Sequence, residues 1–161
     1  MENKLEIKTA LKIQKSAHEV FEAIVDPQKM SNYFIATSTG RMEAGKTLTW
    51  KFPEFDLQFP VYIDKVELDK LISYRWNDYE DGAETRVEIA LEQKKGETLV
   101  TITEKERELN EKGIQWLKGN TGGWANFLAC LKAYLEYGIN LRKGAFDISQ
   151  LPIKDEHDTT V

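Results

Sequence analysis

Few side chains in this sequence have the chemistry of a nucleophile, a general base or a metal ligand. The chain contains one cysteine, Cys130, and two histidines, His18 and His157, which lie far apart in the sequence. A nucleophilic enzyme needs a serine or cysteine beside a histidine, and a zinc site needs several Cys or His ligands at short spacings. Neither pattern is present. The sequence therefore predicts no metal and no cofactor, identifies no catalytic residue and favours a non-catalytic protein, although it leaves an enzyme open.

The surroundings of these three residues favour ordinary structural roles. His18 falls in the first turn of a predicted helix, where we expect it to be solvated, and His157 falls in a predicted tail. Cys130 lies between Phe127 and Leu131 in an apolar helical pattern, and buried free cysteine usually behaves as a small core residue. We therefore predict that none of the three is reactive.

Aromatic residues are the better candidates for a binding site. They make up 11% of the chain, and several share one face of a predicted sheet because they alternate with polar residues. Aromatic rings can line a pocket for an apolar ligand, and indole N–H or tyrosine hydroxyl groups can orient it. The same residues could also form an ordinary core, and that alternative stays open. The candidate ligand-binding residues are Trp50, Phe52, Phe59, Tyr74, Trp76, Trp116, Asn120, Trp124 and Phe127.

Length and charge exclude several classes of protein. A chain of 161 residues is long enough to form one domain with its own core, which we place at residues 1–143, followed by a flexible tail at 144–161. The net charge of −5 disfavours nucleic acid as a partner. The N-terminal segment alternates charged and apolar residues, so it predicts neither a signal peptide nor a membrane helix. We therefore expect a cytoplasmic protein that does not insert into membranes.

The first third of the sequence predicts a strand and two short helices. Alternating apolar residues at 5–13 indicate a half-buried strand. The segment SAHEVFEAIVDPQ predicts a helix, because Ser16 and Glu19 form a capping box at its start. Pro27 can open a second short helix, PQKMSNYF, since proline is tolerated in a first turn. These helices therefore follow the first strand directly.

The middle of the sequence predicts a run of antiparallel strands. Between residues 35 and 107, short alternating segments are separated by turn residues such as Gly and Asp. A change of parity near Asp64 and Lys65 predicts a β-bulge, which would curl the sheet. The charge run EKERELNEK, residues 104–112, is interpreted as a solvated strand end and turn.

A long helix is predicted near the C-terminus. Apolar residues recur at helical spacing from Trp124 onward, until Gly138 or Gly144 ends the helix. Three glycines at 119–123 precede it, and glycine inside a helix is unfavourable. We therefore expect a hinge or corner there, with residues 110–123 as an approach that includes a short helical turn. The one-sided helix can bury its apolar stripe only against the one-sided sheet. The predicted fold class is α+β, with a curved antiparallel sheet of about six to seven strands around the long helix.

The order of these elements resembles the START-like, or SRPBCC (Bet v 1-like helix-grip), superfamily. The segments that carry the resemblance are SAHEVFEAIVDPQKMSNYF, EAGKTLTWKF, VELDKLISYRW and GGWANFLACLKAYLEYG, and the likeness spans roughly residues 3–140. Within the superfamily, the chain is most similar to the branch of the C-terminal domain of the heat-shock protein 90 ATPase activator. This resemblance implies a hydrophobic cavity between sheet and helix, where superfamily members bind lipids, sterols, polyketides or plant hormones. A few members are cyclases, aromatases or oxygenase subunits.

Three functions are therefore compared. The favoured one is a binding or carrier protein for a small hydrophobic or aromatic ligand, with the glycine corner as a gate. The second is a chaperone-associated interaction module, which the resemblance alone implies. It ranks lower because the eukaryotic co-chaperone carries a separate N-terminal chaperone-binding domain that this sequence does not contain. The third is a cofactor-independent cyclase, which would need an acid or base directed into the cavity; none is evident in the sequence.

Overall fold

The computed structural model describes residues 3–146. The expected domain at 1–143 falls almost entirely within this range. Most of the expected tail at 144–161, including His157, lies outside the described residues. Within the described part of the chain, no helix is both long and apolar enough to cross a membrane.

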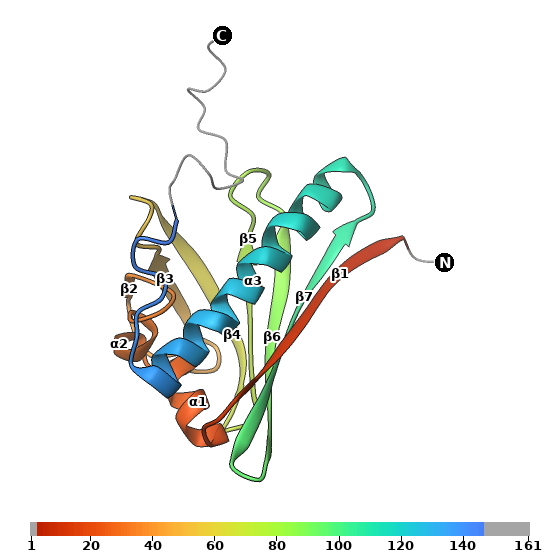
Figure 1. Cartoon of the computed structure of the whole chain (residues 1–161). Helices are drawn as coiled ribbons and strands as arrows, with labels where there is room; N and C mark the ends of the chain where they lie inside the picture. The colour runs from red at the N-terminus through yellow and green to blue at the C-terminus, as the bar shows by residue number, and fades with distance from the viewer. Residues whose placement is uncertain (1–2, 147–161) are drawn as a thin grey trace.

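One antiparallel sheet of seven strands forms the body of the protein (Figure 1). Its spatial order is β1-β7-β6-β5-β4-β3-β2, so each strand from β2 to β7 lies beside the next one along the chain, and β1 pairs with β7. The strands are β1 (Lys4–Ile13), β2 (Thr37–Ser38), β3 (Thr47–Lys51), β4 (Gln58–Glu67), β5 (Leu71–Asn77), β6 (Glu84–Lys94) and β7 (Glu97–Glu108). The predicted α+β fold and strand number are confirmed.

Two short helices follow β1, as predicted. Helix α1 (Ala17–Val25) begins with the capping box of Ser16 and Glu19. Asp26 ends α1 and also caps α2 (Pro27–Met30), because its side chain accepts a hydrogen bond of 2.9 Å from the backbone N–H of Gln28. The two helices are therefore joined by a single residue that serves both.

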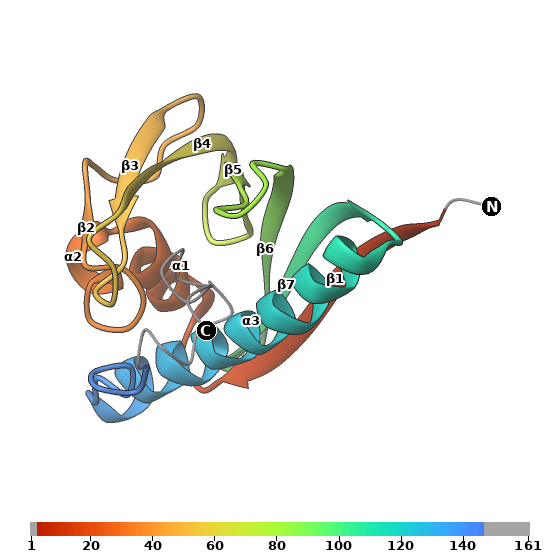
Figure 2. The same cartoon turned by 90° about the horizontal axis from the view of Figure 1, so that it is seen from above.

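The sheet is strongly curved, and the long helix lies inside the curve (Figure 2). The register between β4 and β5 shifts between Ile63 and Lys65, which confirms the predicted bulge. Helix α3 (Glu111–Tyr137) packs along β1 and β7, on the opposite side of the curve from β3 and β4. Side chains from β3, β4 and β5 therefore have to reach across to α3.

The predicted corner at residues 119–123 is wrong, because α3 runs through it without a break. The helix begins at Glu111, where Asn110 accepts a hydrogen bond of 2.8 Å from the backbone N–H of Gly113. It ends at Gly138, which has a φ of 67° and forms the left-handed cap that favours glycine. Buried residues on both sides of the glycines hold the helix against the sheet, and this packing outweighs the low helix propensity of glycine.

We expect Gly122→Ala and Gly123→Ala each to raise the free energy of unfolding by about 0.5–1 kcal/mol. Both glycines are exposed, and an added methyl group at either would meet nothing within 4 Å. Gly113→Ala is the matched control in the same helix. There an added methyl group would collide with the carbonyl oxygen of Glu108, so this variant should be less stable than the wild type. Urea unfolding followed by circular dichroism measures all three, and a destabilised Gly122→Ala variant would show that the glycine has a structural role.

Candidate functional site

Most of the predicted site residues meet in one group of rings between the sheet and α3. Trp76 on β5 stacks on Trp124 on α3 with 5.7 Å between ring centroids, and this contact joins the two layers. The remaining centroid distances in the group lie between 5.2 and 6.4 Å, so the rings pack closely against one another. We call this group the aromatic cluster; its members from the predicted set are Trp50, Phe52, Phe59, Tyr74, Trp76, Trp124 and Phe127.

Phe34 is a central member of the aromatic cluster that the sequence did not indicate. Its ring lies 4.7 Å from that of Phe127 and 5.2 Å from that of Phe52, and it also contacts Trp50 and Trp124. Phe34 lies in the turn after α2, where no helical or strand periodicity marks it as buried. The predicted second helix, PQKMSNYF, ended at Phe34, whereas the observed helix ends at Met30, so the only signal for Phe34 in the sequence is its aromatic type.

Trp116 lies apart from the aromatic cluster. Its ring packs against the guanidinium group of Arg107, which lies 5.9 Å from the ring centroid. In a continuous helix, eight residues separate Trp116 from Trp124 by about 12 Å along the axis. No ring contact within residues 3–146 joins Trp116 to the cluster. Trp116 therefore lies near the start of α3, against Arg107 on β7, and does not belong to the aromatic cluster.

Glu104 is the polar centre of the site, and its position corrects the interpretation of residues 104–112 as a solvated run. The side chain is completely buried, at 0% exposure. It lies on β7 in a cross-strand row with Val87 on β6 and Tyr74 on β5, all on the inner face. Alternation from Val100 and Ile102 already pointed to this position. Because glutamate is rarely fully buried, its charge argued against the inward position that the alternation indicated.

Four donors saturate the carboxylate of Glu104. Its Oε1 accepts hydrogen bonds from Trp124 Nε1 at 2.8 Å and from Asn120 Nδ2 at 3.1 Å. Its Oε2 accepts hydrogen bonds from Trp76 Nε1 at 2.9 Å and from Thr85 Oγ1 at 2.5 Å. The predicted candidates Trp76, Asn120 and Trp124 therefore converge on one group, which the sequence did not identify as their partner.

This arrangement limits the chemistry of Glu104. A carboxylate offers about four lone-pair sites, and indole and amide nitrogens can only donate, so the four contacts use most of the acceptor capacity of Glu104. No ion pair to Glu104 is found in the described part of the chain. A general-base role would require one of the four donors to move first. The carboxylate as it stands ties α3 to β5 and β6 through neutral donors.

The hydroxyl group of Tyr74 is buried without a hydrogen-bond partner in the described part of the chain. The residue is 1% exposed. Burial, together with the nearby charge of Glu104, raises the pKa of Tyr74 well above its ordinary value, so the hydroxyl keeps its proton. Tyr33 has a similarly raised pKa because of burial, but its hydroxyl donates a hydrogen bond of 2.8 Å to the carbonyl of Ala23. The hydroxyl of Tyr74 is therefore a buried hydrogen-bond donor without an acceptor among the described residues.

A hollow of about 400 Å³ opens next to the aromatic cluster, below the segment that follows α3. We call residues 138–146 the C-terminal strap; in Figure 1 it is the blue segment that leaves the lower end of α3 and turns upward. Phe34 belongs both to the wall of this hollow and to the aromatic cluster. None of the nine predicted site residues lines this hollow. The rings among them pack against one another, with centroids 5.2 to 6.4 Å apart.

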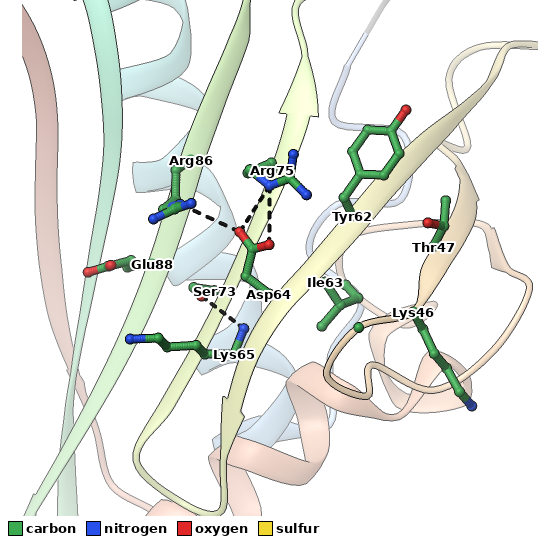
Figure 3. A pocket seen from close by; sticks show the side chains of 11 residues that line it. Lys46, Thr47, Tyr62, Ile63, Asp64, Lys65, Ser73, Arg75, Arg86 and Glu88 are labelled. Atoms are coloured by element: carbon green, nitrogen blue, oxygen red, sulfur yellow. Dashed lines mark hydrogen bonds and ion pairs between the residues drawn. The ribbon is translucent and has the colours of Figure 1, made fainter.

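A second hollow of about 420 Å³ lies on the outer face of β4, β5 and β6, away from α3 (Figure 3). Asp64 at its centre accepts hydrogen bonds from Arg75 Nε at 3.1 and 3.2 Å and lies 3.5 Å from Arg86 Nε. Arg75 also pairs with Glu84 at 3.3 Å. These charges satisfy one another at the surface, as expected for a solvated face, and Arg75 points outward, to the opposite side of the sheet from Tyr74.

The other residues with reactive side chains occupy the positions that the sequence predicted. His18 has 60% of its side chain exposed and pairs with Asp69 at 2.9 Å. Cys130 is buried at 4% exposure, and burial raises the pKa of its thiol; Arg142 opposes this effect, and Glu54 adds to it. No group of three or more potential metal-binding side chains occurs in the part of the chain that the structure describes.

The chain matches one protein family over most of its length, and it resembles several solved structures. Residues 14–136 match the family described as Activator of Hsp90 ATPase homolog 1-like protein. Protein SSP2350 from Staphylococcus saprophyticus is 33% identical, with a TM-score of 0.74, over 86% of this chain and 96% of that chain. No curated protein matches the chain.

Two further solved structures share the fold at lower identity. The Aha1 dimer from Colwellia psychrerythraea is 20% identical, with a TM-score of 0.71, over 83% of this chain and 98% of that chain. DynU16, a protein of the dynemicin biosynthetic locus, is 23% identical, with a TM-score of 0.75, over 84% of this chain and 48% of that chain. At these identities the likeness concerns the fold alone.

Proposed function

The chain belongs to the Activator of Hsp90 ATPase homolog 1-like family, and we propose that this protein binds a small, mostly apolar or aromatic molecule between the curved sheet and α3. The helix-grip fold of this family is compatible with ligand binding and with cyclase-like chemistry. Binding without catalysis is the function that the site supports best, because the carboxylate of Glu104 already has its acceptor sites in use.

The observation that carries the proposal is the unpartnered hydroxyl of Tyr74 inside the aromatic cluster. A buried polar group without a partner costs about 1–3 kcal/mol, so folded proteins rarely retain one without a reason. A ligand that brings a hydrogen-bond acceptor would remove this cost on binding. The raised pKa of Tyr74 keeps the hydroxyl in its donor form at neutral pH.

The surrounding rings define the rest of the ligand. Trp50 and Trp76 contact the ring of Tyr74 edge to face at 5.4 and 5.3 Å, so a flat aromatic ligand would replace one of these contacts with a contact of its own as that ring moves aside. Phe52, Phe59 and Trp76 are only partly buried and form the accessible rim of the aromatic cluster. The proposed ligand is therefore an apolar aromatic molecule that carries one carbonyl or similar acceptor oxygen.

Acetophenone and ethylbenzene make a matched test, because they differ mainly in the acceptor oxygen. We expect acetophenone to shift the indole N–H resonances of Trp76 and Trp124 and to bind about tenfold more tightly than ethylbenzene, as one hydrogen bond would give. The indole of Trp116, which lies apart from the cluster, serves as an internal reference. Equal binding of the two compounds, or no response of Trp76 and Trp124 to either, would contradict the proposal.

We expect Tyr74→Phe to raise the free energy of unfolding of the unliganded protein by about 1 kcal/mol, because it removes a buried donor that has no partner. The same variant should lose the preference for acetophenone over ethylbenzene. Tyr33→Phe is the matched control, since the hydroxyl of Tyr33 does have a partner in Ala23, and it should destabilise the protein. Chemical denaturation measures both variants, and a destabilised Tyr74→Phe variant would indicate that the hydroxyl has a partner in solution.

A role as a chaperone partner has the name of the family as its only support. The buried features described above carry no information about a protein surface. A direct test is the effect of this protein on the ATPase rate of the cognate ninety-kilodalton chaperone. If the Tyr74→Phe variant stimulates the chaperone's ATPase as well as the wild type does, the chaperone-binding surface does not include the proposed ligand site.

A further inference from the structure

We propose that the hollow under the C-terminal strap is the entrance to the aromatic cluster, and that the ion pair between Arg142 and Glu54 is the latch that holds it closed. The proposal rests on the ligand-binding function proposed above. It concerns residues that lie outside the set indicated by the sequence. The hollow is lined by strap residues, among them Arg142 and Phe146, and by residues from other segments, among them Phe34 and Glu54.

The ion pair between Arg142 and Glu54 is bidentate, with two hydrogen bonds. Arg142 Nε donates to Glu54 Oε2 at 3.1 Å, and Arg142 Nη2 donates to Glu54 Oε1 at 2.6 Å. The two side chains are only 14% and 10% exposed, so solvent screens the pair weakly. Glu54 lies between β3 and β4, and Arg142 lies 88 positions further along the chain. The pair therefore ties the strap to the strand side of the hollow.

The guanidinium group of Arg142 also covers the rings at the edge of the aromatic cluster. It lies 5.6 Å from the ring centroid of Phe34 and 5.3 Å from that of Phe52, and Phe146 of the strap lies 4.9 Å from it. Phe34 and Phe52 are cluster members that reach Trp50 and Phe59. Arg142 thus occupies the position that a ligand must cross to reach the cluster from the hollow.

Cys130 reports on the latch, because it is the only cysteine in the sequence and is buried on the part of α3 that senses both charges of the pair. Arg142 lowers the pKa of the thiol. Loss of the Arg142 charge by itself would therefore raise that pKa and slow alkylation of Cys130. We expect opening of the strap to increase the access of solvent to the thiol and to speed the reaction, because Arg142 and Glu54 lie close enough to Cys130 to act on its charge. The two effects have opposite signs.

The test is the rate at which iodoacetamide, a neutral reagent, alkylates Cys130 in the folded protein, followed by mass spectrometry. We expect Arg142→Gln to react about tenfold faster than the wild type, as removal of one partner of a nearly buried ion pair would give. Arg142→Lys, which keeps the charge but not the two-point contact, should be intermediate. Arg41→Gln is the control, because Arg41 makes a similar two-point pair with Glu22 elsewhere on the molecule. A rate for Arg142→Gln equal to or below that of the wild type would overturn the latch.

Acetophenone separates failure of the latch from failure of the proposed function. If the entrance is correct, Arg142→Gln should speed both association and dissociation, as seen by stopped-flow tryptophan fluorescence. Unchanged rates together with faster alkylation would show that the strap opens but is not the route to the cluster. Faster alkylation with no binding of acetophenone to either protein would leave the latch in place and count against the ligand. Circular dichroism of each variant excludes unfolding as the source of faster alkylation.

Discussion

Glu104→Gln should lower the free energy of unfolding by about 3 kcal/mol, the largest effect that we expect from a nearly isosteric change in this protein. The amide would replace one acceptor oxygen by a donor that faces the donors already present. In one orientation of the amide, Trp124 and Asn120 would lose their acceptor; in the other, Trp76 would lose its acceptor while the Thr85 hydroxyl could turn to accept from the amide. Urea unfolding followed by tryptophan fluorescence measures the change.

Two comparisons attribute the effect to this hydrogen-bond network. Glu108→Gln alters a glutamate on the same strand whose side chain is 65% exposed, and it should leave the unfolding midpoint nearly unchanged. Trp124→Phe removes one of the donors, so combining it with Glu104→Gln should cost clearly less than the sum of the two single changes. Additive effects would mean that the indole and the carboxylate do not share an interaction in solution.

Arg107→Met should lower the free energy of unfolding by about 2 kcal/mol, because it removes the cation from a mostly buried group of charges. Arg107 has 9% of its side chain exposed and lies 2.5 Å from Asp81 and 3.4 Å from Asp78, in the connection between β5 and β6. Without it, two partly buried carboxylates would face each other, and Trp116 would lose the guanidinium on its ring. Arg75→Met is the control: Arg75 also has two acidic partners, but it lies on the solvated outer face, so the midpoint should hardly move.

Acid titration gives an independent check on Arg107. Burial tends to raise the pKa of Asp81, but the N–H of Ala83 and the charge of Arg107 outweigh it, so the pKa lies below its ordinary value. Such a group contributes stability that is present above the ordinary aspartate pKa of about 4 and is lost as the pH falls through the lowered value. The wild type should therefore lose more stability than Arg107→Met between about pH 5 and about pH 2. Equal losses would show that Arg107 does not set the charge state of Asp81.

The position of Glu104 shows how a correct pattern can be set aside for a wrong reason. Alternation along β7 placed Val100 and Ile102 on the inner face, and the same alternation continues to Glu104. The neighbouring charges favoured a solvated run, since carboxylates are rarely fully buried. Glu104 is buried because donors from β5, β6 and α3 meet there, and a one-dimensional pattern does not contain that coincidence.

The glycines of α3 illustrate the opposite error. Helix propensity argued for a break near Gly122 and Gly123. The helix nevertheless continues through both glycines, because other residues of α3 hold it in place. Trp116 and Trp124 are both buried, and Asn110 and Gly138 supply the two ends. Tertiary packing along the whole helix outweighs a local preference of about 1 kcal/mol per glycine.

The sequence by itself determined the order of the elements and the position of most of them, with the first half of α3 as the exception. Strand alternation, the capping box at Ser16, the proline at the start of α2 and the bulge near Asp64 depend on residues a few positions apart, so each could be recognised locally. The inward direction of the aromatic residues followed from the same periodicity.

Only the tertiary structure decided which side chains become partners. The donors of Glu104, the unpartnered hydroxyl of Tyr74 and the pairing of Arg142 with Glu54 each depend on segments that lie far apart along the chain. Their meeting is fixed by the curvature of the sheet and by the path of the chain after α3. A hydrogen bond needs its two atoms within about 3 Å, and periodicity predicts a face but not a distance.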